Sequence, residues 1–324
     1  MNLWRRWVCF LSRKEVGTSL ALFRILVGLS VCVTIGSVWS AGLVDMLWYD
    51  VSEGGYRNFW SEARDAYAAP WLVRLMGGPV PQVVWSLVLA NFALGVLLIL
   101  GLGGRLTAFM TLQGTLALLD LNTHTGGSYD ALLQNALWLL VLSPSTVTLS
   151  LDCRIRNGTW WNDCPVMAWP RYLVVFQIIL VYFSTGLQKV SSYWVPGGEM
   201  SALYYIMQQP SWQRFDMSFL AHVYPLTQGA TLMTWCWEVL APLWWIAFVF
   251  SMSKENKSRL ARVMGRYRVR LVFALIGVVF HILLFIFMNL GPFSIISLSF
   301  YACLVHPHEY REWYGRVRNM RRRI

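Results

Sequence analysis

A series of long apolar runs constrains this fold more than any other feature of the sequence. Hydrophobic residues make up 56% of the 324 positions, and charged residues only 13%. A helix needs about 20 mostly apolar residues to cross the hydrocarbon layer of a membrane. The runs predict an all-α, polytopic helical membrane bundle with about eight transmembrane helices, at 19–39, 83–102, 106–121, 131–149, 171–187, 226–250, 271–290 and 292–305.

Three parts are expected along the chain. These are a basic, amphipathic lead at 1–18, one transmembrane domain at 19–305, and a basic tail at 306–324. Two long segments between spans, 40–82 and 188–225, are rich in Trp and Tyr. Such residues prefer the membrane–water interface, and their density is too high for a disordered linker. We therefore expect short interfacial helices in both outer segments.

The distribution of basic residues predicts the orientation of the chain. If the chain starts in the cytoplasm and crosses eight times, 21 of its 27 Lys and Arg lie inside and five outside, with Arg24 in the first span. An excess of Lys and Arg in cytoplasmic loops is typical of membrane proteins. The sequence thus predicts a multi-pass protein of the plasma (inner) membrane with both termini cytoplasmic. The lipid bilayer is then the partner that explains the net charge of +11, and no nucleic acid is needed.

Common soluble-enzyme motifs are missing from the sequence. There is no G-x-S-x-G, H-E-x-x-H or Walker-type pattern, which argues against the chemistries that these motifs serve. The spacing of Cys153 and Cys164 matches no zinc pattern. We predict no metal site.

Lys189 stands apart from the other basic residues, because it is the only lysine between Lys14 and Lys254. It ends the fifth apolar run, in the stretch YFSTGLQKVSSYWVPGG at 182–198. A lysine at a helix end often extends its ammonium to the lipid headgroups. Alternatively, an apolar pocket disfavours the charged form, so that the free amine acts as a base. Both interpretations remain open.

The pattern YF-x-x-G-x-x-K followed by W-V-x-G in this stretch resembles the vitamin K-dependent gamma-carboxylases and the wider group of HTTM-domain membrane proteins. Two further segments support the resemblance, SLALFRILVGL at 19–29 and FHILLFIFMNLGPFS at 280–294. In the animal carboxylases, the lysine of this pattern is the base that deprotonates the reduced quinone. Lys189 occupies that position.

The resemblance implies a gamma-carboxylase-like enzyme, a lyase that uses a reduced quinone of the vitamin K or menaquinol type. The deprotonated hydroquinone reacts with oxygen to give a strong base, and carbon dioxide then adds to a glutamate carbon. A histidine in an outer loop assists this step in the animal enzymes, and His124 is the nearest candidate. Those enzymes bind their protein substrates through a large luminal domain. Here the secreted peptide or protein substrate would be bound by the outer segments or by a partner subunit.

Polar residues within the spans are further candidates, because they are costly in lipid and usually face a cavity or a partner. Glu238 and His281 are both expected near mid-membrane, where a Glu–His pair carries a proton, binds a quinone headgroup, or forms a structural interhelical hydrogen bond. Arg24 either snorkels or pairs with Glu238, and a structural role is favoured. Tyr193 and Trp194 complete the expected quinone site beside Lys189.

Two outer features are expected to face Lys189. Gln113, Asp120 and His124 recur at helical spacing, which predicts a polar wall on one helix face, although a bundle contact explains them equally well. The outer segments are expected to fold over the site as a lid that excludes water. The lid predicts that four aromatic residues are largely buried: Tyr193, Trp194, Trp212 and Tyr224.

A second function from another class remains open. The chain also fits a bacterial HTTM membrane protein without carboxylase activity, serving maturation or export of a secreted peptide. A neighbouring gene for a small secreted peptide would favour this alternative, whereas one for a glutamate-rich secreted protein would favour the carboxylase.

The predicted orientation is testable by cysteine labelling in intact cells. Ser211→Cys should react with an impermeant thiol reagent, because the second outer segment faces outward. Ser258→Cys should react only after permeabilisation. Labelling of Ser258→Cys in intact cells would overturn the orientation.

Overall fold

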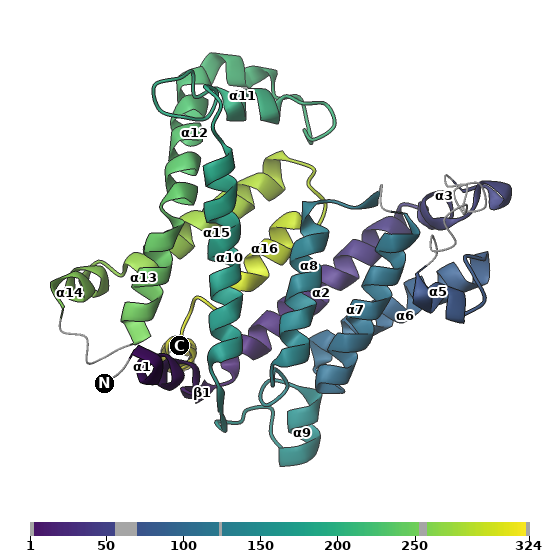
Figure 1. Ribbon diagram of the computed structural model, residues 1–324, viewed down its shortest axis with the longest axis horizontal. Coiled ribbons are helices and arrows are strands. Elements are labelled where there is room, and N and C mark those ends of the chain that lie inside the picture. Colours follow the sequence, from purple (N-terminus) through teal and green to yellow (C-terminus); the bar gives the residue numbers. More distant parts are fainter. Residues whose placement is uncertain (1–2, 56–69, 123–124, 253–257, 322–324) are drawn as a thin grey trace. The chain divides into compact units, whose positions relative to one another are not determined.

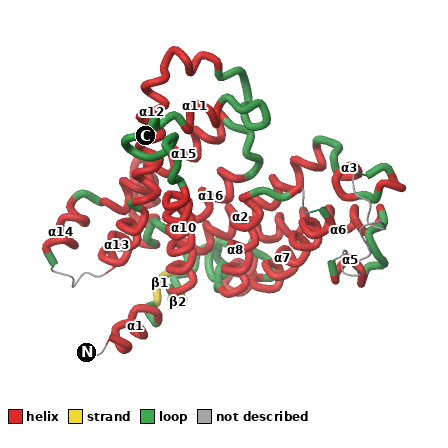
Figure 2. Tube along the Cα trace, turned by 45° about the horizontal axis from the view of Figure 1, so that its top comes forward, coloured by secondary structure: helices red, strands yellow, loops and turns green. Residues whose placement is uncertain are grey.

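The computed structural model describes residues 3–55, 70–122, 125–252 and 258–321, and this part of the chain is mostly helical, with loops between the helices (Figure 2). The prediction of an all-α, polytopic fold is confirmed. Among the described residues there is one small sheet, which the sequence did not predict: β1 (Lys14–Val16) pairs antiparallel with β2 (Pro165–Met167). The chain divides into two compact units. Unit 1 comprises Met1–Arg171 and His306–Ile324, and unit 2 comprises Tyr172–Val305.

Four described helices are long and apolar enough to cross a membrane by length and composition. They are α2 (Thr18–Ser40), α6 (Pro81–Leu100), α10 (Trp169–Gln188) and α15 (Val269–Phe287). A fifth crossing results if the bent segment from Ser218 to Met252 counts as one span. The protein is therefore a multi-pass membrane protein.

Three other predicted spans are helical but shorter or more polar. Helix α7 (Gly104–Leu121) carries Arg105, Gln113 and Asp120. Helix α8 (Ser128–Leu142) ends seven residues before the predicted boundary, because the residue before a proline is disfavoured in a helix and Pro144 follows Ser143. Helix α16 (Phe293–Tyr301) has only nine residues.

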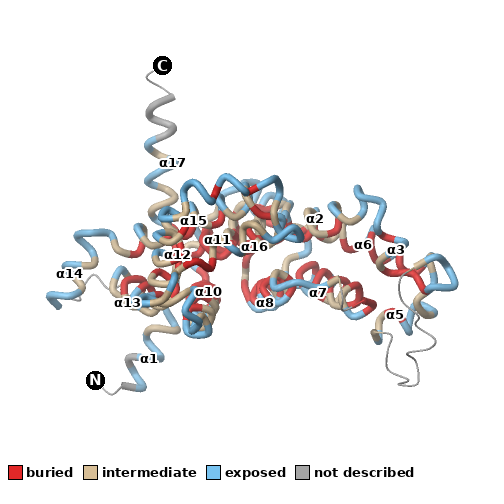
Figure 3. Tube along the Cα trace, turned by 90° about the horizontal axis from the view of Figure 1, so that it is seen from above, coloured by how far each residue is buried: buried red, intermediate tan, exposed pale blue. Residues whose placement is uncertain are grey.

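In unit 1, helices α2, α6, α7 and α8 lie side by side (Figure 1), and buried residues run along α7 and α8 (Figure 3). The contact between α2 and α6 depends on two glycines. A Cβ atom on Gly28 would lie 2.9 Å from the Gly95 carbonyl oxygen, and one on Gly95 would lie 2.8 Å from the Cys32 sulfur. Small residues allow transmembrane helices to approach this closely.

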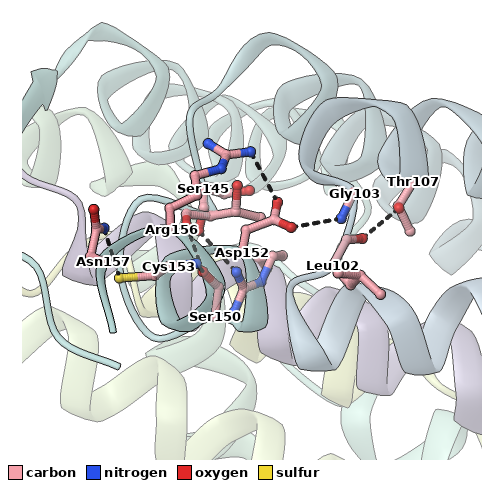
Figure 4. A network of polar contacts seen from close by, with 11 residues as sticks. Leu102, Gly103, Thr107, Ser145, Ser150, Asp152, Cys153, Arg156 and Asn157 are labelled. Atoms are coloured by element: carbon pink, nitrogen blue, oxygen red, sulfur yellow. Dashed lines mark hydrogen bonds and ion pairs between the residues drawn. The ribbon is translucent and has the colours of Figure 1, made fainter. Parts of the chain in front are cut away.

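A polar network ties together the loops at one end of this helix group. Asp152 of α9 (Leu151–Asn157) accepts a hydrogen bond from the Gly103 backbone at 3.1 Å (Figure 4). The buried Arg24 guanidinium donates to the carbonyl oxygens of Ser145 and Leu149, at 3.1 and 2.6 Å. Arg24 thus has the favoured structural role, and its partners are carbonyl oxygens of unit 1, not Glu238.

A second buried arginine joins segments of unit 1 that are distant in sequence. Arg171 donates to both carboxylate oxygens of Glu15, at 2.5 and 2.8 Å, and contacts His306 Nδ1 at 3.2 Å. It therefore connects β1 to the start of α17 (Pro307–Arg321). The predicted amphipathic lead is helix α1 (Leu3–Leu11), with Trp4 and Trp7 exposed.

In unit 2, the predicted sixth span at 226–250 is not one straight helix, which corrects that prediction. Helix α12 (Tyr224–Val239) and helix α13 (Ala241–Met252) meet at a bend of 52°. Pro242 lacks the N–H that would bond to the Glu238 carbonyl, so the regular hydrogen-bond ladder stops there. The basic loop that follows contains helix α14 (Arg259–Arg266).

The outer segments contain short helices, as expected. The first holds α3 (Val44–Trp48), the 3-10 turn η1 (Val51–Glu53) and α5 (Trp71–Leu75), and its residues 56–69 lie outside the described part. The second holds α11 (Ala202–Met207) and the 3-10 helix η3 (Ser218–Val223). Before η3, hydrogen bonds from the Ser218 backbone and hydroxyl lower the pKa of the Asp216 carboxyl.

The close contact of α2 and α6 gives a stability prediction. Gly28→Val should lower the midpoint of thermal unfolding in detergent, because overpacking a tight contact costs about 1–3 kcal/mol. Gly229→Val is the matched control, since nothing lies within 4 Å of a Cβ atom at Gly229 of α12, and valine is a better helix former than glycine. Equal effects of the two variants would contradict the packing role of Gly28.

Candidate functional site

Lys189 forms an ion pair with Glu238 in unit 2. The Lys189 Nζ atom lies 2.5 Å from each carboxylate oxygen of Glu238. The Glu238 side chain is buried, with 6% exposed, and the Lys189 side chain is 21% exposed. Lys189 is therefore not an isolated group. Its ammonium is held by a carboxylate from another helix.

Local sequence explains how the two charges meet. Tyr182, Gly186 and Lys189 recur at helical spacing and lie on one face of α10 and its end. A Cβ atom at Gly186 would lie 2.9 Å from the Glu238 Cβ atom, so glycine lets α12 cross α10 at this point. Glu238 also belongs to a buried polar stripe on α12 with Thr227, Thr231 and Thr234.

The turn after α10 places Trp194 over the ion pair. The backbone N–H of Trp194 donates to the Ser191 carbonyl at 2.9 Å, and the Lys189 Nζ atom lies 4.4 Å from the centroid of the Trp194 ring. An ammonium over an indole face is attracted by the ring quadrupole. Lys189 therefore has two partners, a carboxylate and an aromatic face.

The predicted aromatic lid is wrong for two of its four residues. Tyr193 is 47% exposed and Trp212 is 41% exposed, whereas Trp194 and Tyr224 are partly buried. Helix α11 packs on α12 through an edge contact between Tyr204 and Tyr224, with ring centroids 5.0 Å apart. Tyr193 instead packs against the exposed Tyr205. Lys189 is shielded by Glu238 and Trp194, without a closed lid.

A buried chain of hydroxyl and imidazole groups lies in the same unit. The Tyr301 hydroxyl donates to the Tyr182 hydroxyl at 3.0 Å, and this oxygen lies 2.6 Å from His281 Nε2. The prediction of a Glu238–His281 pair is wrong. Glu238 forms its ion pair with Lys189, and His281 forms its hydrogen bond with Tyr182. The sequence analysis missed Tyr182 and Tyr301. A signal for Tyr182 was present, because it lies seven residues before Lys189 and therefore on the same helix face as Lys189.

The predicted polar wall is only partly described. His124 lies outside the described residues, and α7 ends at Leu121 with Asn122 in an extended conformation. Helical spacing therefore does not continue from Asp120 to His124, which corrects the argument that placed them on one face. Gln113 and Asp120 do share a face of α7, in unit 1.

This arrangement defines a polytopic helical membrane protein with a lysine–glutamate pair beside a buried tyrosine–histidine chain. The family model for the HTTM domain matches residues 12–308, so the chain belongs to the HTTM-domain family. This is also the family of the membrane part of vitamin K-dependent gamma-carboxylases. Comparison with curated proteins and with solved structures finds no match.

The burial of the pair predicts strong non-additivity between its two residues. Lys189→Met should destabilise the protein by about 3 kcal/mol, because it leaves a buried carboxylate without its counter-charge. Adding Glu238→Met should recover most of that loss, since replacing both buried charges by apolar groups is often neutral. Thermal or denaturant unfolding in detergent measures both effects.

The control for this comparison of single and double variants is the exposed pair Arg316–Glu312 of α17. Exposed ion pairs contribute about 0–1 kcal/mol, so Arg316→Met, Glu312→Met and their combination should all be close to wild type. If the Lys189 and Glu238 variants were also additive and mild, the charges would be solvated and the pair would not organise unit 2.

Proposed function

We propose that this protein is a membrane-embedded enzyme of the gamma-carboxylase type. It acts in the plasma (inner) membrane, on a glutamate of a secreted peptide or protein, with a reduced quinone as co-substrate. The observation that carries the proposal is the Lys189–Glu238 pair, which holds a movable proton next to an aromatic face. Membership of the HTTM family supports the type of reaction.

The residues around the pair fit a reduced quinone. This ligand is a flat aromatic ring with hydroxyl groups at its edge, so it needs an apolar wall and a proton acceptor. Trp194 offers the wall and the Lys189–Glu238 pair offers the acceptor, while Tyr193 extends the aromatic surface. A reduced quinone bound there and deprotonated would supply, through its own oxidation by oxygen, the base needed before carbon dioxide adds to glutamate.

The pair explains how a charged lysine becomes a base. A low-dielectric environment penalises two charges more than two neutral groups. When a ligand excludes water, the ammonium proton of Lys189 passes to the Glu238 carboxylate, which lies at hydrogen-bond distance. The free amine then accepts the proton of a ring hydroxyl. In this proposal Lys189 is the base, and Glu238 is the residue that prepares it.

A second candidate is the HTTM protein without carboxylase activity, serving maturation or export of a secreted peptide. The half-exposed aromatic residues of the second outer segment favour it, since Tyr193, Tyr205 and Trp212 suit binding of a peptide or a partner subunit. In such a protein, Lys189 and Glu238 would only hold α10 against α12.

Substitutions of Lys189 separate these functions. The assay is incorporation of labelled carbon dioxide into a glutamate-containing peptide, with reduced quinone and oxygen, by the purified protein in lipid nanodiscs. Lys189→Ala should abolish it. Lys189→Arg should also fail, because a guanidinium stays protonated, although it can still pair with Glu238 and should leave thermal stability close to wild type.

Glu238→Gln is the companion variant. It should lower turnover at least 100-fold, within the contribution typical of a positioned base, because the amide cannot accept the ammonium proton. If Lys189→Arg kept full activity, Lys189 would be a counter-charge and not the base. If wild type showed no carboxylation while peptide maturation in cells required an intact pair, the second candidate would stand.

A further inference from the structure

The direction of the buried hydrogen-bond chain follows from counting its protons. Tyr301 and Tyr182 are both 5% exposed, so each hydroxyl needs an acceptor within the protein. Among the described residues, the Tyr301 hydroxyl bonds only to the Tyr182 hydroxyl, so it must donate to it. Tyr182 must then donate to His281 Nε2. The ring proton of neutral His281 is consequently on Nδ1.

His281 therefore presents an N–H donor that has no acceptor among the residues that the structure describes. Its side chain is 0% exposed, and Nδ1 has no hydrogen-bond partner within this part of the chain. An unsatisfied buried donor costs about 1–3 kcal/mol. The indole N–H of Trp244 of α13 is a second such donor, on a side chain that is 1% exposed. The Trp244 ring lies 5.9 and 6.0 Å from the Tyr182 and Tyr301 rings.

The surroundings of these two donors specify the chemistry of a ligand. Both donors are neutral, and the nearby walls are the aromatic rings of Trp237, Phe280 and Phe293. Neutral donors supply no counter-charge for a charged ligand. A flat, apolar molecule with carbonyl or hydroxyl oxygens at its edge would satisfy the donors and keep the walls apolar.

The chain lies one helical turn from the ion pair along α10. Helix α12 crosses α10 where Glu238 meets Gly186. Tyr182 lies four residues before Gly186, which corresponds to about 6 Å along the axis of α10. Gly277 leaves room for the Tyr301 hydroxyl, since a Cβ atom at this position would overlap it.

We propose that His281 Nδ1–H donates a hydrogen bond to one ring oxygen of the quinone whose other oxygen faces the Lys189–Glu238 pair. Tyr182 and Tyr301 are positioning residues that fix the histidine tautomer, and Trp244 is the second donor. The identity of the ligand rests on the proposed function. The binding site itself is testable without any turnover.

The first test measures binding of an oxidised, short-chain menaquinone, which does not turn over, by quenching of tryptophan fluorescence in nanodiscs. His281→Gln keeps an amide near the Nε2 position, toward Tyr182, but offers no donor at Nδ1. It should weaken binding at least about tenfold, the loss expected for one buried hydrogen bond. His281→Asn places its amide nitrogen near the Nδ1 position and should retain most of the affinity. His222→Gln, at an exposed histidine of η3, is the control and should not change binding.

The second test observes the tautomer by nitrogen NMR of histidine-labelled protein, which has only five histidines. The His281 signal, assigned by its loss in His281→Gln, should show a protonated Nδ1 that shifts when the menaquinone is added. Tyr182→Phe should release the tautomer and weaken binding. A role limited to packing would leave the tautomer unaffected by the ligand.

These tests fail separately from the carboxylase proposal. The binding assay requires no turnover, so menaquinone binding without carboxylation in wild type would contradict only the proposed reaction. Equal menaquinone affinity of wild type and His281→Gln, or an Nδ1 signal unchanged by the ligand, would show that water alone satisfies these donors and would overturn the inference. Absence of menaquinone binding by wild type would overturn it as well.

Discussion

An ammonium and a carboxylate that leave water require each other, and this requirement decides how three segments of unit 2 meet. Burial of either charge alone is strongly unfavourable. The pairing of Lys189 and Glu238 is possible because Gly186 lets α12 cross α10 in close contact. Pro242 ends the regular helix just after Glu238, and the turn after α10 lays Trp194 on the ammonium. Glycine, proline and tryptophan each have a position here that follows from the ion pair.

Unit 1 satisfies two buried arginines in different ways. The buried Arg24 guanidinium donates to the carbonyl oxygens of Ser145 and Leu149. Arg171 instead forms a bidentate ion pair with the Glu15 carboxylate. Both arginines hold loops and chain ends together, which explains why the one described sheet, β1–β2, forms beside Arg171 although its strands have three residues each.

The sequence predicted the helices better than their contacts. Length and hydropathy are local properties, so the long spans and the short outer helices could be found from residue patterns alone. Lys189 could be found because it stands isolated among apolar residues. Its partner could not, since Glu238 is 49 positions away and the rotation of two helices about their axes is set by packing. The helix break had a visible signal in Pro242, because a proline within a helical pattern ends or kinks the helix.

The two sequence-based interpretations of Lys189 both treated it as a single group, and the ion pair changes that question. A snorkelling lysine keeps its proton because water solvates it, and an isolated buried lysine loses its proton because nothing does. In the pair, the proton has two adjacent sites, and the local dielectric decides between them. Binding of an apolar ligand is therefore the event that would turn an anchor into a base. A site of this kind needs a fixed second contact to the same ligand, because proton transfer depends on the orientation of the hydroxyl. In the proposed mechanism, the tyrosine–histidine chain, one turn along α10, would provide that contact.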